Sequence, residues 1–381
     1  MNDSSDGLAV VGAGVIGLAV AWRAAAEGHR VTVLDPRPAR GGASWVAGGM
    51  LAPVAEAWPG EEAALALGEE SLRRWPRFAA DLRAEGTHSG SGLSESGTVV
   101  AAFDGADAEQ LDVLARYLTG LGRQATFVTG RQLRRTEPGL GPVRAGLLVP
   151  GDLFVDNRAL LEALLAAARL RGVEFVPESA RALAADTVWT ESGPRRFAAV
   201  VLAAGAHSGT LHPQLAGAVR PLKGEILRLR ARRGTVPPPA RTVRAVVEGR
   251  PVYLVPRTGG GLVVGATQYE AGFDTTVTAR GVRELLDAAE RVFPGVAEYE
   301  LTETSAGLRA GSDDTVPYLG PLRDGVYAAT GHHRNGLLLA PVTADAVLAW
   351  LAGTEPPEGT SEARPDRNSS EERIDAGLRQ R

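Results

Sequence analysis

Three glycines near the start of the chain have the spacing of a phosphate-binding turn. The stretch GAGVIG places Gly12, Gly14 and Gly17 between an apolar run and a segment with helical character. Glycine there permits a tight turn and a close approach of a pyrophosphate to the backbone, while the helix N-terminus favours negative charge. Asp35 ends the next apolar run, where its carboxylate can accept hydrogen bonds from an adenosine ribose. The pattern predicts a dinucleotide site, without the 2′-phosphate that Asp35 would repel.

The segment GGASWVAGGMLAP, residues 41–53, helps to decide between two kinds of dinucleotide. Nicotinamide and flavin dinucleotides share the glycine turn, but a simple nicotinamide-binding fold would continue here with another crossover to a parallel strand. Glycine and alanine instead let main-chain N–H groups reach a planar ring. A flexible surface loop fits poorly with Trp45, Met50 and Leu51. The segment therefore favours a flavin that lies against this backbone.

The composition argues against several other classes of protein. The 381 residues carry a formal net charge of -4 and no cysteine. This charge argues against nucleic acid or an anionic membrane as the main partner, and without cysteine there is no disulfide, thiolate metal site or cysteinyl flavin. The flavin is therefore expected to be non-covalent. Because the sequence shows no signal-peptide pattern and no apolar run long enough to span a bilayer, we expect a cytoplasmic protein with no membrane partner.

Apolar runs typical of buried parallel strands lie at both ends and in the middle of the chain. They predict strands at 8–12, 31–34, 173–176, 198–205 and 326–331. Helices are expected over 15–27, from 157 to 171 after Asp156 as N-cap, and over 335–352. A further helix is expected over 61–85, where Pro76 should kink or divide it.

Strands of more alternating character, with one helix among them, occupy the middle of the chain. The strands are expected at 225–230, 250–257, 261–267 and 299–311, and the helix at 279–293. We therefore expect an α/β fold in which a discontinuous Rossmann-like FAD-binding domain is combined with an α+β substrate domain built on a mainly antiparallel sheet. The first domain comprises 1–85, 140–220 and 310–353, and the second comprises 86–139 and 221–309. The polar remainder, 354–381, is expected to be disordered.

Eight blocks of this sequence together resemble one family of flavoenzymes. They are GAGVIG, LDP, GGASWVAGGMLAP, RPLKGEILRL, VYLVPR, LVVGAT, SAGLRAG and GHHRNGLLLAP, in the expected order over residues 8–352. The resemblance is to the glycine oxidase branch of the D-amino-acid-oxidase-type flavoenzymes, which is associated with thiamine biosynthesis. It implies a non-covalent FAD, a small amino-acid substrate, O2 as the electron acceptor and often a homotetramer.

The resemblance also implies which residues form the site. Arg309 in SAGLRAG matches the arginine that pairs with the substrate carboxylate, to which a planar guanidinium offers two parallel donors. Tyr253 matches a tyrosine whose hydroxyl helps to hold that carboxylate, and Arg334 matches a second arginine near both ligand and flavin. A core tyrosine and two surface arginines are the structural alternatives. The residues expected at the cofactor are Gly12, Gly14, Val15, Ile16, Gly17, Asp35, Ala43, Ser44, Gly48, Gly49, Met50, Ala180, Gly205, His332, His333, Asn335, Gly336, Leu337 and Leu338.

Four further residues bear on the site without deciding its chemistry. The adjacent His332 and His333 have no other ligand residues near them in the sequence, so no metal is expected. His333 stands where relatives commonly have Phe or Tyr, and Pro251 where some have His, which leaves the substrate preference open. Lys223, the only lysine in the chain, lies in PLKGE at the expected crossing between domains. Either a specific contact or chance has retained it.

The implied reaction is the oxidation of glycine, or else of sarcosine or a small D-amino acid. Hydride passes from Cα to flavin N5, the imino acid hydrolyses to an α-keto acid and ammonia, and O2 yields H2O2. No side-chain acid or base is required. The alternatives are a flavin dehydrogenase with another acceptor and an amine oxidase of a different biosynthetic pathway. A nicotinamide-dependent dehydrogenase would leave 41–53 unexplained, and a silent FAD-binding subunit would not need Arg309 and Arg334.

Overall fold

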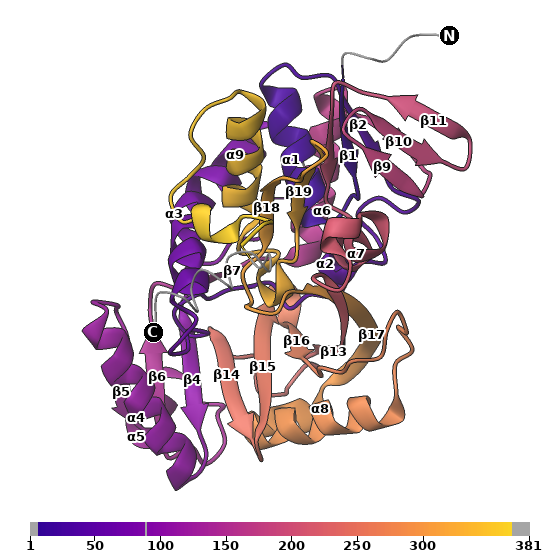
Figure 1. Ribbon diagram of the computed structural model, residues 1–381. Coiled ribbons are helices and arrows are strands. Elements are labelled where there is room, and N and C mark those ends of the chain that lie inside the picture. The colour runs from indigo at the N-terminus through magenta and orange to yellow at the C-terminus, as the bar shows by residue number, and fades with distance from the viewer. Residues whose placement is uncertain (1–6, 88–89, 368–381) are drawn as a thin grey trace.

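Two large β-sheets organise the protein, one in the upper half and one in the lower half of Figure 1. The computed structural model describes residues 7–87 and 90–367. The first sheet has six strands in the order β18–β19–β12–β1–β2–β8, all parallel to their neighbours except β18, which is antiparallel to β19. Their bounds are β1 Leu8–Val11, β2 Val31–Leu34, β8 Glu174–Val176, β12 Ala199–Leu202, β18 Tyr318–Pro321 and β19 Tyr327–Thr330.

Both faces of the six-stranded sheet are covered, because its central strands are apolar on both sides. In β1, Leu8 and Val10 face a core built with four helices, whereas Ala9 and Val11 face the opposite way. The helices are α1 Val15–Ala26, α3 Glu62–Ala84, α6 Asn157–Leu170 and α9 Ala340–Leu351. The opposite face packs on a small antiparallel sheet of β9 Ala182–Ala184, β10 Thr187–Thr190 and β11 Gly193–Arg196, and on the turns after β12.

The second sheet has eight strands in the order β17–β13–β16–β15–β14–β4–β6–β5, of which β4 and β14 pair in parallel and the others antiparallel. The bounds are β4 Thr98–Ala102, β5 Thr126–Thr129, β6 Ala145–Val149, β13 Arg220–Arg230, β14 Thr242–Val247, β15 Arg250–Arg257, β16 Gly261–Gly265 and β17 Glu300–Gly311. Helix α8, Ala279–Val292, covers one face. Helices α4, Gly105–Gly120, and α5, Gly130–Thr136, pack on the β4–β6–β5 end (Figure 1).

Short elements link the two sheets. Helix α2, Ala43–Val46, and β3, Met50–Leu51, lie in the segment 41–53, and β3 pairs with β7, Leu153–Phe154. The remaining short elements are α7 Ser208–Leu211 and the 3-10 turns η1 Gly205–His207, η2 Pro213–Leu215, η3 Thr258–Gly260, η4 Pro294–Glu298, η5 His333–Asn335 and η6 Ser361–Ala363. Among the residues described, no helix combines the length and apolarity needed to cross a membrane.

Two expected helices differ from the prediction. Helix α3 runs without division through Pro76, because that proline lies on the exposed face while Trp75 and Phe78 on the buried face keep their packing. The last helix, α9, begins at Ala340 rather than at 335. Turn η5 and the bends after it occupy the expected first turn of this helix.

The chain also crosses between the sheets at points that composition does not reveal. Strand β6 lies between β4 and β5 in the second sheet, although the expected boundary at 140 placed it with the first. Residues 354–367, predicted to be disordered, are ordered: Arg367 donates from Nε to Asp314 over 2.8 Å and its guanidinium lies 4.0 Å from the centre of the Tyr318 ring. The rest of the predicted tail, 368–381, falls outside the described residues. The domain limits as a whole stay a prediction.

The helix core of the first sheet can be tested on α6. Leu164 is fully buried, whereas Leu170 on the same helix is 67% exposed. Truncation of the buried side chain removes apolar contacts and leaves a cavity, so we expect Leu164→Ala to lower the free energy of unfolding by about 2–5 kcal/mol. Leu170→Ala is the matched control, with an expected change within about 0.5 kcal/mol. Urea unfolding measures both, and equal effects would contradict this packing.

Candidate active site

The glycine turn between β1 and α1 is built for close backbone packing. A Cβ on Gly12 would come within 2.4 Å of Ala203 O, and one on Gly17 within 1.9 Å of Gly12 O. Gly14 differs, because a Cβ there would meet Ser44 Oγ at 3.3 Å and nothing else within 4 Å. As N-cap of α1, Gly14 supplies no capping side chain, and the first turn of the helix carries no acidic residue. Although Ser44 Oγ accepts from Val15 N, the next two N–H groups of α1, those of Ile16 and Gly17, remain available to a phosphate group.

Asp35 lies at the carboxyl edge of the same sheet and braces the turn. Its Oδ2 accepts from Ala13 N at 2.8 Å, and its Oδ1 accepts from Arg37 N at 2.7 Å. Each carboxylate oxygen keeps further acceptor capacity for a ribose hydroxyl. Ala180 packs near the carboxyl ends of β1, β2 and β8, and Gly205 O accepts from Thr330 Oγ1 at 3.1 Å just beyond β12 and β19. The structure thus brings these predicted cofactor residues to the edge where a dinucleotide binds in open α/β sheets.

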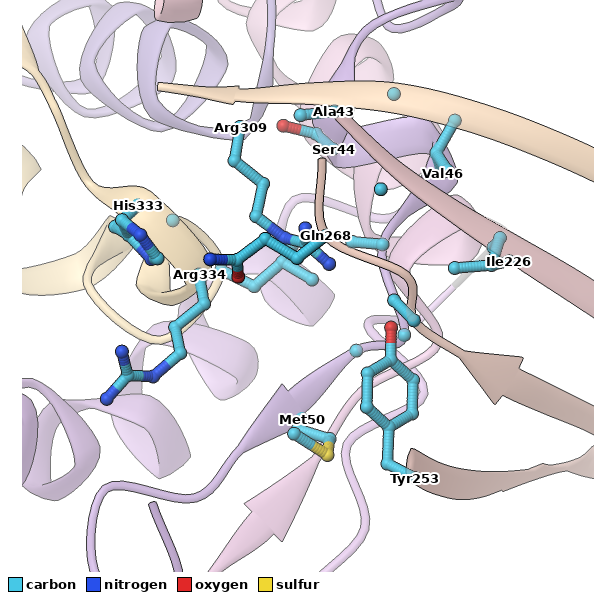
Figure 2. A pocket seen from close by; sticks show the side chains of 18 of the residues that line it. Ala43, Ser44, Val46, Met50, Ile226, Tyr253, Gln268, Arg309, His333 and Arg334 are labelled. Atoms are coloured by element: carbon cyan, nitrogen blue, oxygen red, sulfur yellow. The ribbon is translucent and has the colours of Figure 1, made fainter. Parts of the chain in front are cut away.

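The segment 41–53 runs from this turn to a pocket between the two sheets. Ser44 Oγ accepts from Val15 N at 3.1 Å, which ties α2 to the first turn of α1. The segment itself, strands β13, β14, β15 and β17 of the second sheet, and the turn after β19 enclose the pocket (Figure 2). The predicted residues that line it are Ala43, Ser44, Gly48, Gly49, Met50, Tyr253, Arg309, His333, Arg334, Gly336 and Leu337. The predicted residues that do not line it are Gly12, Gly14, Val15, Ile16, Gly17, Asp35, Ala180, Gly205, His332, Asn335 and Leu338.

Two positions of this segment require glycine for a reason that the sequence did not reveal. A Cβ on Gly48 would come within 2.5 Å of the Tyr253 ring. Gly49 has a φ of 90°, and a Cβ on it would come within 2.2 Å of Val155 O. Both positions therefore exclude side chains because the protein itself packs against them.

Buried polar side chains fix the backbone of the segment 41–53 by hydrogen bonds to its carbonyl oxygens. Asn157, fully buried, donates from Nδ2 to Ser44 O at 2.8 Å and to Trp45 O at 2.9 Å. Arg257 donates from Nη2 to Gly48 O at 2.6 Å. The segment is consequently held in one conformation rather than left as a flexible loop.

Arg309 and Tyr253 enter the pocket from different strands of the second sheet. Arg309, on β17, donates from Nη1 to Thr267 O at 3.3 Å, and its guanidinium lies on Gly224, where a Cβ would come within 2.5 Å of Nη1. No carboxylate of the described chain forms a salt bridge with it. Tyr253, on β15, directs its hydroxyl into the pocket (Figure 2), and burial raises the pKa of this phenol, which therefore stays protonated. A cation and a neutral hydroxyl thus face the same space.

Arg334 lines the pocket but is already paired. Its Nη2 lies 2.8 Å from Glu61 Oε2, and its Nε lies 3.5 Å from Glu56 Oε2. Glu56 also pairs with Arg244, at 3.3 Å. Burial lowers the pKa of Arg334, but the two carboxylates outweigh it and raise the pKa above its usual value. Arg244, Glu56, Arg334 and Glu61 thus form a chain of alternating charges along one side of the pocket, with no net charge.

The turn that carries the two histidines presents neutral rings. Burial lowers the pKa of His332 to about 3, and its Nε2 lies 3.0 Å from Thr343 Oγ1. Burial, with Arg334 and Arg309 nearby, lowers the pKa of His333 to about 4. Leu338 O accepts from Trp75 Nε1 at 2.9 Å and thereby ties the turn to α3. Within the part of the chain that the structure describes, no group of three potential ligand side chains could hold a metal ion.

Three polar pocket residues escaped the sequence analysis. Glu56 lies three residues beyond the glycine-rich segment, so continuation of that motif could have found it. Arg244 faces Tyr253 across the β14–β15 pair, a relation that exists only once the strands are paired. Gln268 lies three residues beyond β16, in an extended stretch with no recognisable motif.

Comparison with known proteins identifies the family of the chain. The family model described as DAO, FAD dependent oxidoreductase, matches residues 8–350. The glycine oxidase of Geobacillus kaustophilus is 33% identical over 347 residues, which cover 88% of this chain and 90% of that protein. A crystal structure of glycine oxidase from that organism superimposes with a TM-score of 0.87 at 30% identity, covering 95% and 98% of the two chains. The bifunctional protein ThiO/ThiG of Nostoc sp. is 33% identical over 358 residues, which cover 90% of this chain and 52% of that protein.

The chain therefore belongs to the family of FAD-dependent oxidoreductases. Within it, the sequence is similar to the glycine oxidases, as predicted. The predicted fold class is confirmed, and so are the enzyme class and the cofactor, FAD. The open helix N-terminus at Gly14 and the segment held between the sheets fit such a dinucleotide, so the residues present are consistent with the cofactor.

The glycine turn yields a test of cofactor binding. An alanine at Gly14 meets no backbone, so Gly14→Ala should fold, but its methyl group occupies the space at the helix N-terminus. We expect the dissociation constant for FAD to rise about tenfold, equivalent to about 1.4 kcal/mol. Fluorescence titration of the apoprotein with FAD measures this constant. Gly151→Ala, also in open space but in the turn between β6 and β7, is the control, and equal affinities would contradict the placement.

Asp152 supports the Glu56 segment and makes stability depend on pH. Its buried carboxylate accepts from Ala55 N at 3.3 Å, and burial raises its pKa to about 7 despite opposing hydrogen bonds and Arg244. Between about pH 4 and pH 7 the folded state thus holds more protons than the unfolded state, so this group's contribution to stability falls as pH rises.

Replacement of the Asp152 carboxyl should remove its contribution to the pH dependence of the free energy of unfolding. We expect Asp152→Asn to gain stability relative to the unchanged protein as pH rises from about 5 to about 8, because the amide does not ionise. Urea unfolding at several pH values measures the difference. A difference that stays constant across this range would show that Asp152 does not titrate there.

Proposed function

We propose that this enzyme oxidises glycine, or a closely related small amino acid, to an imino acid with FAD as the oxidant and O2 as the final acceptor. One observation carries the proposal. Arg309 faces the pocket with no carboxylate partner in the described chain, next to the hydroxyl of Tyr253. A guanidinium and a neutral hydroxyl are suited to bind one carboxylate. The names of the similar glycine oxidases support the choice of substrate.

The charge balance of the pocket supports a substrate with a single carboxylate. Arg244 and Arg334 are matched by Glu56 and Glu61, which leaves the charge of Arg309 for the ligand. A second carboxylate would have to displace one of these internal pairs and leave a buried charge without its partner. Glycine, sarcosine and small D-amino acids all meet this requirement.

The protein's contribution to the reaction is binding and exclusion of water. FAD, held between the glycine turn and the segment 41–53, would supply the two-electron oxidation of the substrate Cα, with O2 as the final acceptor that becomes H2O2. Arg309 and Tyr253 hold the carboxylate and so fix the position of Cα. Ile226, Val252 and Leu337 add apolar walls. Water hydrolyses the released imino acid, so glycine, O2 and H2O give glyoxylate, ammonia and H2O2.

Several wider properties belong to the same proposal. The resemblance to the branch associated with thiamine biosynthesis, and the similarity to proteins named ThiO/ThiG, support a role in supplying the imino acid to thiazole synthesis. The absence of cysteine supports a non-covalent FAD. We also propose a cytoplasmic homotetramer without nucleic-acid or membrane partners, in keeping with the charge of the chain and the family resemblance.

The function is tested by anaerobic mixing of the holoenzyme with glycine, sarcosine, D-alanine and D-proline. We expect glycine to bleach the visible band of the oxidised flavin, and air to restore it with formation of peroxide. Bleaching without recovery in air would replace the oxidase by a dehydrogenase with another acceptor. A flavin that none of the four compounds reduces would overturn the substrate class.

The role of Arg309 is tested by Arg309→Met. Loss of charge-assisted hydrogen bonds worth about 1.5–3 kcal/mol should lower kcat/KM roughly 10- to 100-fold, while FAD remains bound. Arg283→Met, on the exposed side of α8, is the control and should leave kcat/KM unchanged. Equal kcat/KM values for the two variants would remove Arg309 from the substrate site.

A further inference from the structure

Lys223, the only lysine of the chain, is a buried cation at the back of the substrate site. It lies on β13, and its side chain is 3% exposed. Its Nζ lies 2.9 Å from Asp274 Oδ2 and 3.6 Å from Glu225 Oε1, and it donates to Thr276 O. The hydrogen bond from Lys223 holds the pKa of Asp274 well below its usual range, so this carboxylate stays charged. The cluster fastens the segment 267–278 to β13.

Lysine suits this position for a geometric reason. A compact ammonium directs three donors to acceptors that surround it, whereas a guanidinium is longer and planar. Glu225 is fully buried, and a Cβ on Gly281 would come within 1.4 Å of its Oε2, so Glu225 is tightly enclosed on the side of Gly281. A specific contact therefore explains why this lysine remains in a chain otherwise rich in arginine.

Backbone pairing continues the same attachment toward the pocket. Lys223 and Tyr269 exchange backbone hydrogen bonds of 2.9 and 3.0 Å. Thr267 is attached to β13 as well, because its Oγ1 accepts from Glu225 N at 2.9 Å. Because successive residues of an extended segment face opposite ways, Gln268 turns from this side into the pocket.

Gln268 thereby stands in the same pocket as the substrate-binding arginine. Thr267 O accepts from Arg309 Nη1 at 3.3 Å, and Gln268 is the next residue (Figure 2). At the far end of the segment, Phe273 stacks on His207, with ring centres 4.7 Å apart. The segment is thus fastened both to β13 and to the turn after β12.

We propose that Gln268 donates a hydrogen bond from its side-chain amide to the substrate carboxylate on Arg309, and that Lys223 is the positioning residue that holds Gln268 there. The inference rests on the proposed function, because it takes a carboxylate as the ligand. Gln268 is the specificity-determining residue of the pair: it adds a donor without adding charge, as a single carboxylate requires. Lys223 acts through Asp274 and the segment 267–278.

The test uses the holoenzyme and two readouts. The first readout is the dissociation constant of glycolate, an unreactive carboxylate, which is measured from the change that glycolate causes in the flavin spectrum. The second readout is the pair of kinetic constants KM and kcat for glycine. Gln268→Ala should raise the dissociation constant and KM about tenfold with little change in kcat. Gln268→Glu, of similar size but without the donor, should raise both further.

The positioning role is tested through Asp274, because Lys223→Met leaves Glu225 without its cation and endangers folding. Asp274 is about half exposed, so Asp274→Asn should fold, and we expect it to raise both constants several-fold. If Lys223 acts through Gln268, the double variant Asp274→Asn with Gln268→Ala should bind glycolate no more weakly than Gln268→Ala alone. Arg220→Met is the control. Arg220 lies on the same strand as Lys223, and its replacement removes only an exposed ion pair with Asp313, so it should change neither constant.

Other outcomes overturn the inference. Additive effects in the double variant, or a lower Tm for Asp274→Asn with an unchanged dissociation constant, would reduce the Lys223 cluster to a structural role. An unchanged dissociation constant of glycolate in Gln268→Ala would show that Gln268 does not donate a hydrogen bond to the carboxylate. If glycine fails to reduce the flavin while glycolate still binds, the proposed function is wrong and the glycolate series alone decides this inference. A protein that binds no glycolate but is reduced by glycine would overturn only this inference, and one that shows neither would overturn both.

Discussion

The hydrogen bonds that fix the backbone of residues 44–48 are the constraint on which both halves of the site depend. Asn157 holds the carbonyls of Ser44 and Trp45, and Arg257 holds that of Gly48. The Asn157 Oδ1 in turn accepts from Arg228 at 3.1 Å and from Arg257 at 3.2 Å, so the amide is satisfied on both sides. A buried network of this kind is rigid because any broken bond leaves an unpaired polar group.

The fixed segment joins the dinucleotide turn to the substrate pocket. On one side, Ser44 accepts from the first turn of α1, and on the other, Gly48 provides the flat surface on which Tyr253 packs. A displacement of this backbone would therefore move the phosphate end and the substrate end of the site together.

Electrostatics then selects the ligand. Inside a pocket, a charge without a partner is costly, so the pairing of Arg244 and Arg334 with acidic residues matters as much as the freedom of Arg309. Lys223 follows the same rule behind the sheet, where Asp274 and Glu225 surround it. The contrast between the matched cations and Arg309 supports the proposal that an anionic substrate binds at Arg309.

The sequence by itself determined the class of protein, because its signals are local. The spacing of Gly12, Gly14 and Gly17, the small residues of 41–53 and the apolar strand patterns are readable within short windows, and they predicted the cofactor and both sheets. The tertiary structure alone decided which arginine is free, why Gly48 is small, and what Lys223 holds. These depend on contacts such as Arg334 with Glu61, Gly48 with Tyr253 and Lys223 with Asp274, whose partners are distant in sequence. No local pattern encodes such a contact, since it forms only when packing of the two sheets brings the side chains together.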